Sequence, residues 1–354
     1  MVRTLIDNRF FRRLGLALAA CWLALASAAC ASSTLQCEGR GELDAAAEAM
    51  LQHHELAGFA LLAGDKTGPK LRVSYGQWDI EETIPVASAG KWLAAAAILS
   101  LADDGVLNLD DPISTWFPGT PNADTITIRQ LLSHTSGIDP FIVFKRLGDD
   151  GVEASGRRIL GEALLAEPGA EFRYGGSSFQ VAGAAAEIAT GETWRNLFDR
   201  KIAAPLGIES ARWGHPFNGS DVATPQLGGG LYITIDDFGA FLTALSNDGK
   251  PILKAPSLDE MLSNVRGDAA GIDVPSVISE PFGYGLGVWC EVDETAECAF
   301  AHSTGAFGTM PWIDKEKGVW GVIMMRDRFD RVFKEERALA DLMSACVKNK
   351  KADP

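Results

Sequence analysis

The sequence predicts a mixed α/β fold in which both ends of the chain build one sheet and a helical region is inserted between them. Runs typical of strands occur before residue 80 and again after residue 283, whereas the stretch between them is mostly helical in pattern. The 354 residues are 47% hydrophobic and 22% charged, which is enough apolar content for a large core. Strands at both ends argue against two consecutive domains. We expect an α/β domain formed by residues 38–110 and 265–350, and a mostly helical domain formed by residues 111–264.

The first thirty residues have the pattern of an export signal. Arginines precede residues 14–29, an apolar, alanine-rich stretch that is short for a membrane span and closes with small residues. An uncleaved anchor is the alternative. The residues before Cys30 loosely resemble a bacterial lipoprotein cleavage box, which would leave a lipid anchor. Those before Cys21 resemble it better but would leave a very short apolar region. We therefore expect an exported protein, periplasmic or secreted, that is attached to a membrane only if it is lipidated.

The charge of the chain excludes nucleic acid as a partner. The net charge is −15, and removal of residues 1–30, which carry four arginines and one aspartate, makes it −18. An acidic surface repels phosphate backbones, and no basic stripe with interleaved aromatic residues is present.

The elements of the N-terminal part follow from local patterns. Apolar residues recur at helical spacing over residues 42–56. Residues 58–63 and 71–78 are short apolar runs split by Lys66-Thr67-Gly68-Pro69, which predicts a hairpin. A helix that begins at Ser88 follows and ends at Asp103-Asp104-Gly105, where glycine suits a left-handed cap.

The rest of the chain divides into a helical part and a strand part. In the middle we expect helices over residues 128–134, 156–167, 177–190, 192–206, 234–247 and 257–264. After Gly283 we expect strands over residues 285–292, 298–303, 309–314 and 319–325, and an amphipathic helix over residues 335–347.

The cysteines suggest two disulfides. A lipidated Cys30 would leave four cysteines, which allow three connectivities. Cys290 and Cys298 flank an acidic turn between two apolar runs, so a cross-hairpin disulfide is the preferred pairing, and Cys37 with Cys346 would then join the two ends of the fold. Four free thiols are the alternative, which an oxidising compartment disfavours.

A serine and a lysine at the start of an apolar helix are the candidate chemical groups. Ser88-Ala89-Gly90-Lys91 precedes an uncharged run, and residues three apart on a helix lie on one face. Helix N-termini favour developing negative charge, and an alanine-rich helix desolvates Lys91, which lowers the pKa of a lysine. A neutral amine can then activate the serine hydroxyl as a nucleophile. The alternative is a serine cap followed by a lysine that reaches solvent, and this is the commoner meaning of the bare motif.

A second motif carries a family resemblance. Leu131-Leu132-Ser133-His134-Thr135-Ser136-Gly137-Ile138 follows Leu107-Asn108-Leu109-Asp110-Asp111-Pro112. With Ser88 and Lys91, these residues resemble the serine hydrolases of the class C β-lactamase and D,D-peptidase superfamily, which includes many esterases. The resemblance runs from about residue 42 to about residue 346. It implies a mainly antiparallel sheet flanked by helices, an inserted all-helical domain, an active site in the cleft between them, and neither metal nor other cofactor.

The third motif of that family is a tyrosine two residues before an asparagine. The segment Pro168–Ser178 matches its surroundings, with Tyr174 at the tyrosine and Gly176 at the asparagine position. The resemblance implies that Tyr174 shuttles the nucleophile's proton. The amide-holding role of the asparagine is lost unless Ser177 or Ser178 substitutes. A buried structural tyrosine is the alternative for Tyr174.

The fourth family motif is Lys-Thr-Gly, or His-x-Gly in several relatives, on a strand that lines the cleft. We align Ser303-Thr304-Gly305 with it, which puts Ser303 at the lysine, and a shift of one residue would put His302 there. The first alignment implies an oxyanion hole from the backbone N–H groups of Ser88 and Ala306. Without the cationic lysine, substrates with a free carboxylate should bind more weakly.

Other candidate residues are weaker. His53-His54-Glu55 lacks further ligands at metal spacing, so a solvated helix end is the preferred interpretation over zinc. We expect His134 to brace a turn. The glycine-rich segment 227–231 lacks the lysine of a phosphate loop and is interpreted as a turn into a helix.

The sequence therefore predicts a serine hydrolase that works through an acyl-enzyme on a small-molecule ester or amide. The catalytic residues are Ser88, Lys91 and Tyr174. The close alternative is a β-lactamase or D,D-carboxypeptidase. A non-catalytic binding protein that retained the fold is a second alternative, which Gly176 and Ser303 would favour.

Overall fold

The computed structural model describes residues 37, 39–279, 281–294 and 297–348. The expected export signal and the cleavage boxes at Cys21 and Cys30 lie outside these residues. No helix in the described part of the chain is long and apolar enough to cross a membrane.

The central sheet is built from both ends of the chain, as the sequence predicts. Within the described residues it has seven strands in the order β2-β1-β12-β11-β10-β9-β8, and each neighbouring pair is antiparallel. The strands are β1 (Gly58–Asp65), β2 (Gly68–Gly76), β8 (Gly283–Tyr284), β9 (Trp289–Val292), β10 (Cys298–His302), β11 (Thr309–Asp314) and β12 (Val319–Met325). The predicted fold class is confirmed.

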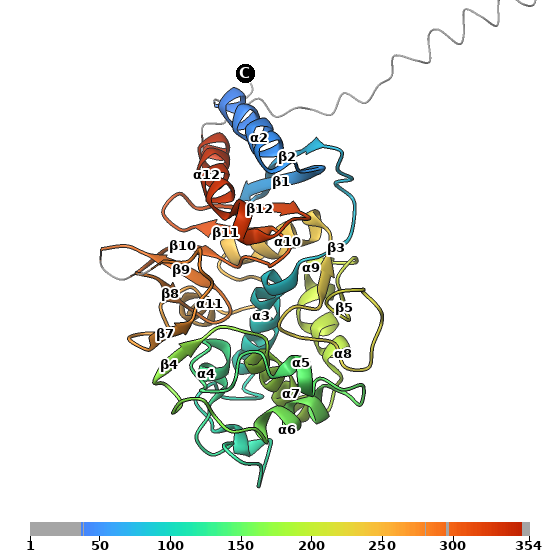
Figure 1. Cartoon of the computed structure of the whole chain (residues 1–354), viewed down its shortest axis with the longest axis vertical. Helices are drawn as coiled ribbons and strands as arrows, with labels where there is room; N and C mark the ends of the chain where they lie inside the picture. Colours follow the sequence, from blue (N-terminus) through green and yellow to red (C-terminus); the bar gives the residue numbers. More distant parts are fainter. Residues whose placement is uncertain (1–36, 38, 280, 295–296, 349–354) are drawn as a thin grey trace, which may run out of the picture. The chain divides into compact units, whose positions relative to one another are not determined.

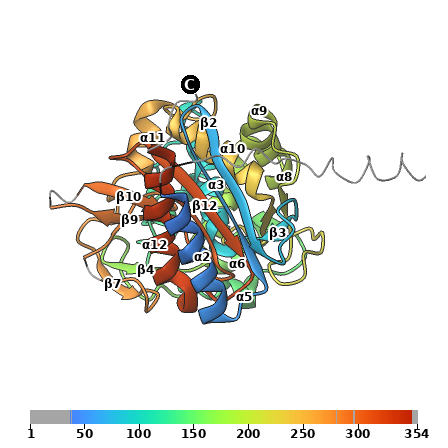
Figure 2. The same ribbon diagram turned by 90° about the horizontal axis from the view of Figure 1, so that it is seen from above.

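Helices cover both faces of this sheet. Successive side chains of a strand point to opposite faces, so Phe59 and Leu61 of β1 join one apolar cluster while Ala60 and Leu62 join another. The first cluster includes α2 (Arg40–His54) and α12 (Phe329–Lys348), and the second includes α3 (Gly90–Asp103) and α10 (Ile235–Ser246). Figure 2 shows α2 and α12 side by side in front of the strands.

The middle of the chain is mostly helical and lies below the sheet in Figure 1. Its other helices are α4 (Ile128–Leu132), α5 (Val143–Arg146), α6 (Val152–Leu160), α7 (Ser177–Thr190), α8 (Trp194–Phe198), α9 (Ala204–Leu206) and α11 (Ala255–Met261), with the 3₁₀ turn η2 (Ile113–Thr115) and the π-helical turn η3 (Asp199–Ala203). A further 3₁₀ turn, η1 (Ala87–Ala89), lies directly before α3. Helix α10 also comes from this part, yet its apolar side chains Phe238 and Leu242 join the core on the sheet. The division into two domains stays a prediction.

Two expected elements are interrupted. The expected helix 192–206 is divided into α8, η3 and α9. The expected strand 285–292 is wrong in its first half: only Trp289–Val292 form a strand, β9, because the chain turns between β8 and β9 at Gly287, where φ is 84°. A Cβ on Gly287 would lie 2.9 Å from the carbonyl oxygen of Lys91, so the turn passes directly against α3. Glycine is required there by both the backbone angle and the close approach.

Short strands that the sequence did not predict position the site. β3 (Ile84–Pro85) pairs with β6 (Leu231–Ile233), which also pairs with β5 (Arg212–Trp213). β4 (Glu171–Arg173) pairs in parallel with β7 (Ala270–Asp273). Strands of two to four residues carry too little periodicity to be recognised in a sequence.

Both preferred disulfide pairings are present in the structure. Cys37, before α2, is bonded to Cys346 in α12, and Cys290 in β9 is bonded to Cys298 in β10. The first joins the two terminal helices and the second joins two neighbouring strands.

Candidate active site

Ser88 lies on a short 3₁₀ turn that runs directly into α3. The turn follows β3, and the backbone N–H of Val86 donates to the carbonyl of Leu231 next to that strand pair. Ala87 has a positive φ of 46°, an uncommon backbone conformation for a residue with a side chain. Ser88 is therefore held on a tight bend in front of the helix and is partly exposed.

Lys91 is buried directly beneath Ser88. Its Nζ lies 2.8 Å from the Ser88 hydroxyl oxygen and 2.6 Å from the carbonyl oxygen of Gly228, and the residue is 1% exposed. Burial lowers the pKa of Lys91 to about 7, because the charged ammonium is desolvated among the apolar residues of α3. The amine is thus largely available as a base just above neutral pH.

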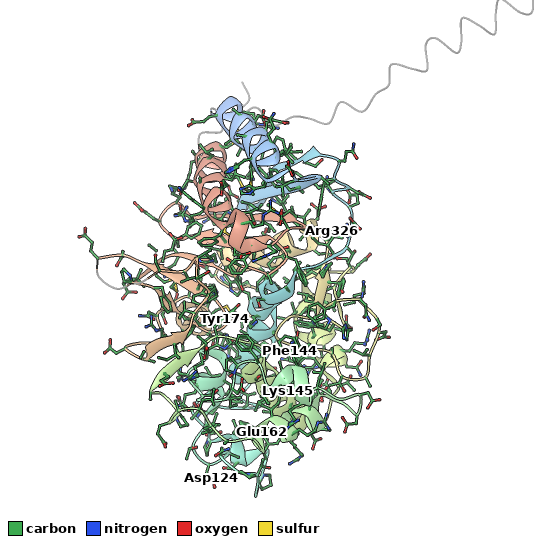
Figure 3. All side chains as sticks on the ribbon, viewed as in Figure 1. Asp124, Phe144, Lys145, Glu162, Tyr174 and Arg326 are labelled. Carbon is green, nitrogen blue, oxygen red and sulfur yellow. A yellow bond between two sulfur atoms is a disulfide. The ribbon has the colours of Figure 1, made fainter. Side chains whose placement is uncertain are left out.

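Tyr174 completes the group. It follows β4, and its backbone N–H donates to the carbonyl of Asp273 in β7. The Nζ of Lys91 lies 4.8 Å from the centroid of the Tyr174 ring. Burial raises the pKa of Tyr174 to about 12, and hydrogen bonding to Ser88 and Trp289 counteracts part of that rise. The phenol is therefore neutral at ordinary pH, and Figure 3 shows it between the strands above and the helices below.

A cavity of about 480 Å³ opens over these three residues. It is lined by Ala87, Ser88, Lys91, Phe141, Phe144, Tyr174, Gly175, Gly176, Pro216, Phe217, Gln226, Gly228, Gly229, Ile272, Asp273, Val274, Pro275, Ile278, Trp289, Thr304, Ala306, Phe307 and Phe329. The volume lies in the ordinary range for a small-molecule site.

The segment that follows β10, residues 303–306, lines the cavity with only some of its residues. Thr304 and Ala306 line it, whereas Ser303, Gly305 and His302 are not among its described lining residues. The Ser303 hydroxyl donates to the carbonyls of Ser88 and Gly287, at 3.3 and 3.4 Å, and the buried His302 contacts the Thr304 hydroxyl at 2.9 Å.

Gly305 holds this segment against the nucleophile turn. A Cβ at residue 305 would collide with the carbonyl oxygen of Val86, so the two backbones approach as closely as glycine allows. The backbone of Ala306 is consequently brought to the same cavity as that of Ser88.

Gly176 and its surroundings reveal a residue that sequence reasoning missed. Ser177 and Ser178 do not line the cavity: the Ser177 hydroxyl accepts from the backbone N–H of Val143, and that of Ser178 contacts the Ser136 hydroxyl. Instead, a Cβ on Gly176 would lie 3.2 Å from the side-chain nitrogen of Gln226, which lines the cavity. An amide from a segment fifty residues away thus occupies the space beside Gly176, and no sequence signal marked it.

Two other candidates support the site from outside the reaction centre. His134 is buried among the rings of Tyr174, Phe179 and Tyr284, and burial lowers its pKa well below the usual range, with a further contribution from Lys91. A neutral imidazole packed beside Tyr174 fits the expected bracing role. The glycine-rich segment 227–231 supplies the Gly228 carbonyl that contacts Lys91.

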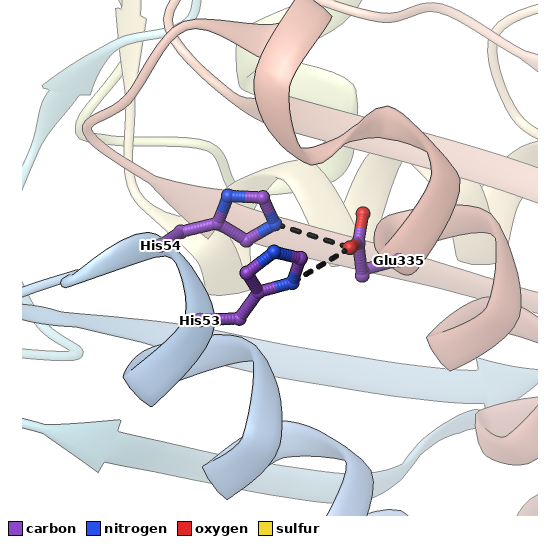
Figure 4. A group of neighbouring side chains, drawn as sticks. All are labelled: His53, His54 and Glu335. Carbon is purple, nitrogen blue, oxygen red and sulfur yellow. Dashed lines mark ion pairs between the residues drawn. The ribbon is translucent and has the colours of Figure 1, made fainter.

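The carboxylate that lies beside His53 and His54 is not that of the neighbouring Glu55. The structure brings Glu335 of α12 to both: its Oε1 lies 3.4 Å from the Nδ1 of His53 and 3.2 Å from the Nε2 of His54 (Figure 4). The three ligand atoms lie within 4.8 Å of one another, and they are of the types that zinc prefers. None of the three lines the cavity. The group ties the end of α2 to α12.

Comparisons with known proteins agree with this geometry. A family model described as Beta-lactamase matches residues 43–343. PbpX of Bacillus subtilis, named after the penicillin-binding proteins, is 30% identical over 187 residues, which are 47% of this chain and 46% of PbpX. The protein flp of Staphylococcus aureus is 28% identical over 189 residues, 48% of this chain and 37% of flp. The chain thus matches less than half of the length of these curated relatives.

Solved structures extend the similarity over most of the chain. A Bacteroides dorei protein named after the beta-lactamases is 30% identical, with a TM-score of 0.78 over 88% of this chain and 99% of that one. EstCE1, described as a hydrolase with promiscuous acyltransferase activity, is 20% identical, with a TM-score of 0.66 over 86% of this chain and 98% of its own, and shows the shared fold. With the family model spanning nearly the whole described chain, this protein belongs to the Beta-lactamase family.

Proposed function

We propose that this protein hydrolyses uncharged esters or small amides through an acyl-enzyme on Ser88. The observation that carries the proposal is the pair formed by Ser88 and Lys91, in which a buried amine lies 2.8 Å from the hydroxyl oxygen. A nucleophilic serine needs an adjacent base within hydrogen-bond reach.

Acylation follows from the positions of these groups. The neutral Lys91 amine accepts the Ser88 proton while the hydroxyl oxygen bonds to the substrate carbonyl carbon. The Gly228 carbonyl accepts a hydrogen bond from the same Nζ and holds the resulting ammonium. The C–O or C–N bond of the leaving group then breaks, and the leaving group takes the proton from Lys91, with the Tyr174 hydroxyl as relay. Water then attacks the acyl carbon and gives a proton to the Lys91 amine. The bond between the acyl carbon and the Ser88 oxygen breaks, Ser88 takes that proton back, and the acid product leaves.

The negative charge that develops on the carbonyl oxygen needs donors. The backbone N–H groups of Ser88 and Ala306 are assigned to this oxyanion hole, because both residues line the same cavity and Gly305 holds their segments in contact. The loss of one such donor typically costs about 3 kcal/mol of transition-state stabilisation.

The charges around the cavity favour an uncharged substrate over a β-lactam or a stem peptide. Lys91 and Asp273 are the charged side chains among its described lining residues, and Lys91 is committed to Ser88. A substrate carboxylate therefore meets no dedicated cation. Ser303, at the position where the family has lysine, is turned to the backbone of Ser88 and Gly287.

The test is labelling and turnover in matched serine variants. Wild-type protein should be labelled by a fluorophosphonate probe, give an acyl-enzyme mass shift on the peptide that contains Ser88, and turn over a short nitrophenyl ester. The Ser88→Ala variant should lose all three properties. The matched control is Ser100→Ala, which removes a buried hydroxyl of the same helix that only donates to the Ala97 carbonyl.

Two outcomes would reject the proposal in different ways. Fast turnover of a chromogenic cephalosporin without ester hydrolysis would favour the penicillin-recognising alternative. Folded protein that is not labelled at Ser88 would favour a non-catalytic binding protein. In the active case, kcat/KM should rise with pH around pH 7, as the Lys91 amine loses its proton.

A further inference from the structure

Exposed apolar side chains are concentrated at the candidate active site. Among the described residues, six large hydrophobic side chains are strongly exposed: Val106, Phe141, Phe144, Leu165, Phe217 and Ile272. Four of them, Phe141, Phe144, Phe217 and Ile272, line the single cavity over Ser88. Isolated exposed hydrophobic residues are normal on a protein surface, whereas a cluster around a concave site marks a ligand-binding surface.

Three phenylalanines from distant segments form a continuous rim on this cavity. Phe144 of α5 stacks on Phe217, with ring centroids 6.4 Å apart and an interplanar angle of 24°. Phe217 lies in the loop between β5 and β6, and Phe307 lies between β10 and β11. The two rings meet edge-on, with centroids 6.4 Å apart. We call Phe144, Phe217 and Phe307 the aromatic rim. Figure 3 labels Phe144 a little below and to the right of Tyr174.

The rim is not explained by packing of the core. Phe144 is 58% exposed and Phe217 is 68% exposed, and neither belongs to the apolar clusters of the interior. Exposed aromatic rings lower solubility and do not stabilise the fold. Their concentration at the opening of one cavity therefore indicates that they bind the molecule that enters it. Aromatic faces bind flat or extended apolar groups by stacking and by removal of apolar surface from water.

The charge pattern around the rim agrees with an apolar ligand. Asp273, the acidic residue at the cavity, is held by the Arg173 guanidinium, whose Nη1 lies 2.6 Å from its carboxylate. Arg173 itself is not among the described lining residues. The described lining thus presents aromatic rings and a carboxylate that is already paired with Arg173. Its cationic residue, Lys91, contacts Ser88, so a negatively charged substrate finds no unpaired cation there.

We infer that the substrate carries a large apolar group, an aryl ring or an extended alkyl chain, that packs on the aromatic rim while its carbonyl lies at Ser88. This inference rests on the proposed function and adds to it the class of group that the enzyme selects. Each methylene buried in the transition state can raise kcat/KM about fourfold, until the apolar part of the cavity is filled.

Two substrate series test the inference on the two sides of the ester bond. The acyl series compares nitrophenyl acetate, hexanoate and hemisuccinate, the last ending in a carboxylate. The alcohol series compares 2-naphthyl acetate with vinyl acetate. If the apolar group is on the acyl side, kcat/KM should be at least about tenfold higher for hexanoate than for acetate. If it is on the alcohol side, kcat/KM should be higher by the same factor for 2-naphthyl acetate than for vinyl acetate. In either case the hemisuccinate should be the poorest acyl donor.

Variants separate the rim from the catalytic groups. Phe217→Ala should lower the hexanoate-to-acetate ratio, or the naphthyl-to-vinyl ratio, by at least about fivefold. Leu165→Ala, at a residue that is 51% exposed and does not line the cavity, is the matched control and should change neither ratio. Because both side chains are exposed, both variants are expected to fold, which circular dichroism checks.

The failures of the two proposals differ. If Ser88 is labelled by the fluorophosphonate and the short esters are hydrolysed, but both ratios stay the same in Phe217→Ala and Leu165→Ala, the inference is overturned while the proposed function stands. If the hemisuccinate is the best acyl donor, the inference is overturned as well. If Ser88 is not labelled and no ester is hydrolysed, the proposed function is rejected and the inference with it.

Discussion

Two buried ionisable side chains lie on opposite sides of the central sheet, Lys91 in α3 and Glu336 in α12, and their surroundings differ. Burial shifts both towards the neutral form: the pKa of Lys91 is lowered to about 7, and that of Glu336 is raised to about 8 with a smaller contribution from Glu335. The same physical cause therefore acts on both faces of the sheet.

The difference lies in what each group contacts. Lys91 has the Ser88 hydroxyl and the Gly228 carbonyl as partners and opens to a cavity. Both carboxyl oxygens of Glu336 are buried without a hydrogen-bond partner in the described part of the chain, and Glu336 lines no described cavity. A shifted pKa thus becomes a candidate for chemistry only where a nucleophile and an opening accompany it. At Glu336 it is a cost to stability.

The largest expected effect is on the Lys91 side. Lys91→Met keeps an unbranched apolar side chain that is one atom shorter but removes the base, so kcat/KM for a nitrophenyl ester should fall by about a thousandfold or more. The free energy of unfolding at pH 7 should stay the same or rise, because a desolvated amine is removed from the core. Steady-state kinetics and urea unfolding measure the two quantities. A Lys91→Met variant with wild-type activity would show that Lys91 is not the base, and Lys91 and Glu336 would then not differ in function.

The second expected effect concerns the side of the sheet with the terminal helices. The Cys37–Cys346 disulfide closes a loop with a sequence separation of 309, whereas Cys290–Cys298 has a separation of 8. Since a cross-link restricts the unfolded chain more when the loop is longer, removing Cys37 and Cys346 together should lower the free energy of unfolding by about 2–5 kcal/mol. Removing Cys290 and Cys298 should cost less.

Activity provides the second readout for this disulfide. Below the unfolding temperature, the Cys37→Ser, Cys346→Ser double variant should retain the wild-type kcat/KM, because neither cysteine lines the cavity. A loss of activity in fully folded double variant would show that the two faces of the sheet are coupled.

The third effect is the pH dependence that Glu336 imposes. Its pKa is raised from 4.5 to about 8, so between these values the folded protein holds a proton that the unfolded chain has released. The contribution of Glu336 to stability is therefore present at low pH and lost as the pH rises from about 4.5 to 8, by about 1.4 kcal/mol per pH unit.

Glu336→Gln removes this dependence. The stability gained by the variant over wild type should grow steadily from pH 5 to pH 8 in urea unfolding, while kcat/KM stays at the wild-type value. A difference that is flat across this range would mean that Glu336 is already ionised in the folded protein.

The smallest expected effect is within the cavity. Gln226→Ala should lower kcat/KM by about tenfold, the equivalent of one hydrogen bond to the substrate, because its amide lies beside Gly176 and lines the cavity. The Ser88 labelling rate with a small fluorophosphonate should change much less. Equal loss in both measurements would indicate a structural role for Gln226 in the turn before β6.

The helices and strands that were predicted correctly are those with a clear local pattern of apolar residues. The hairpin of β1 and β2 follows from two short apolar runs split by a turn, β11 and β12 coincide with the expected strands 309–314 and 319–325, and the expected helix 177–190 coincides with α7. The expected helix 156–167 is wrong at both ends, since α6 covers Val152–Leu160. Helix ends depend on capping and packing that apolar periodicity does not record.

The sequence by itself determined the pairing of Ser88 with Lys91, because residues three apart within one turn are neighbours whatever the rest of the fold does. It also located β1, β11 and β12 in the sheet, since strands that are buried on both faces have continuous apolar runs. The tertiary structure alone decided that Gln226 lies beside Gly176, that Glu335 meets His53 and His54, and that Phe144, Phe217 and Phe307 share one rim. These residues are separated by tens to hundreds of positions, and contacts over such distances arise only when the packed core fixes the segments that carry them.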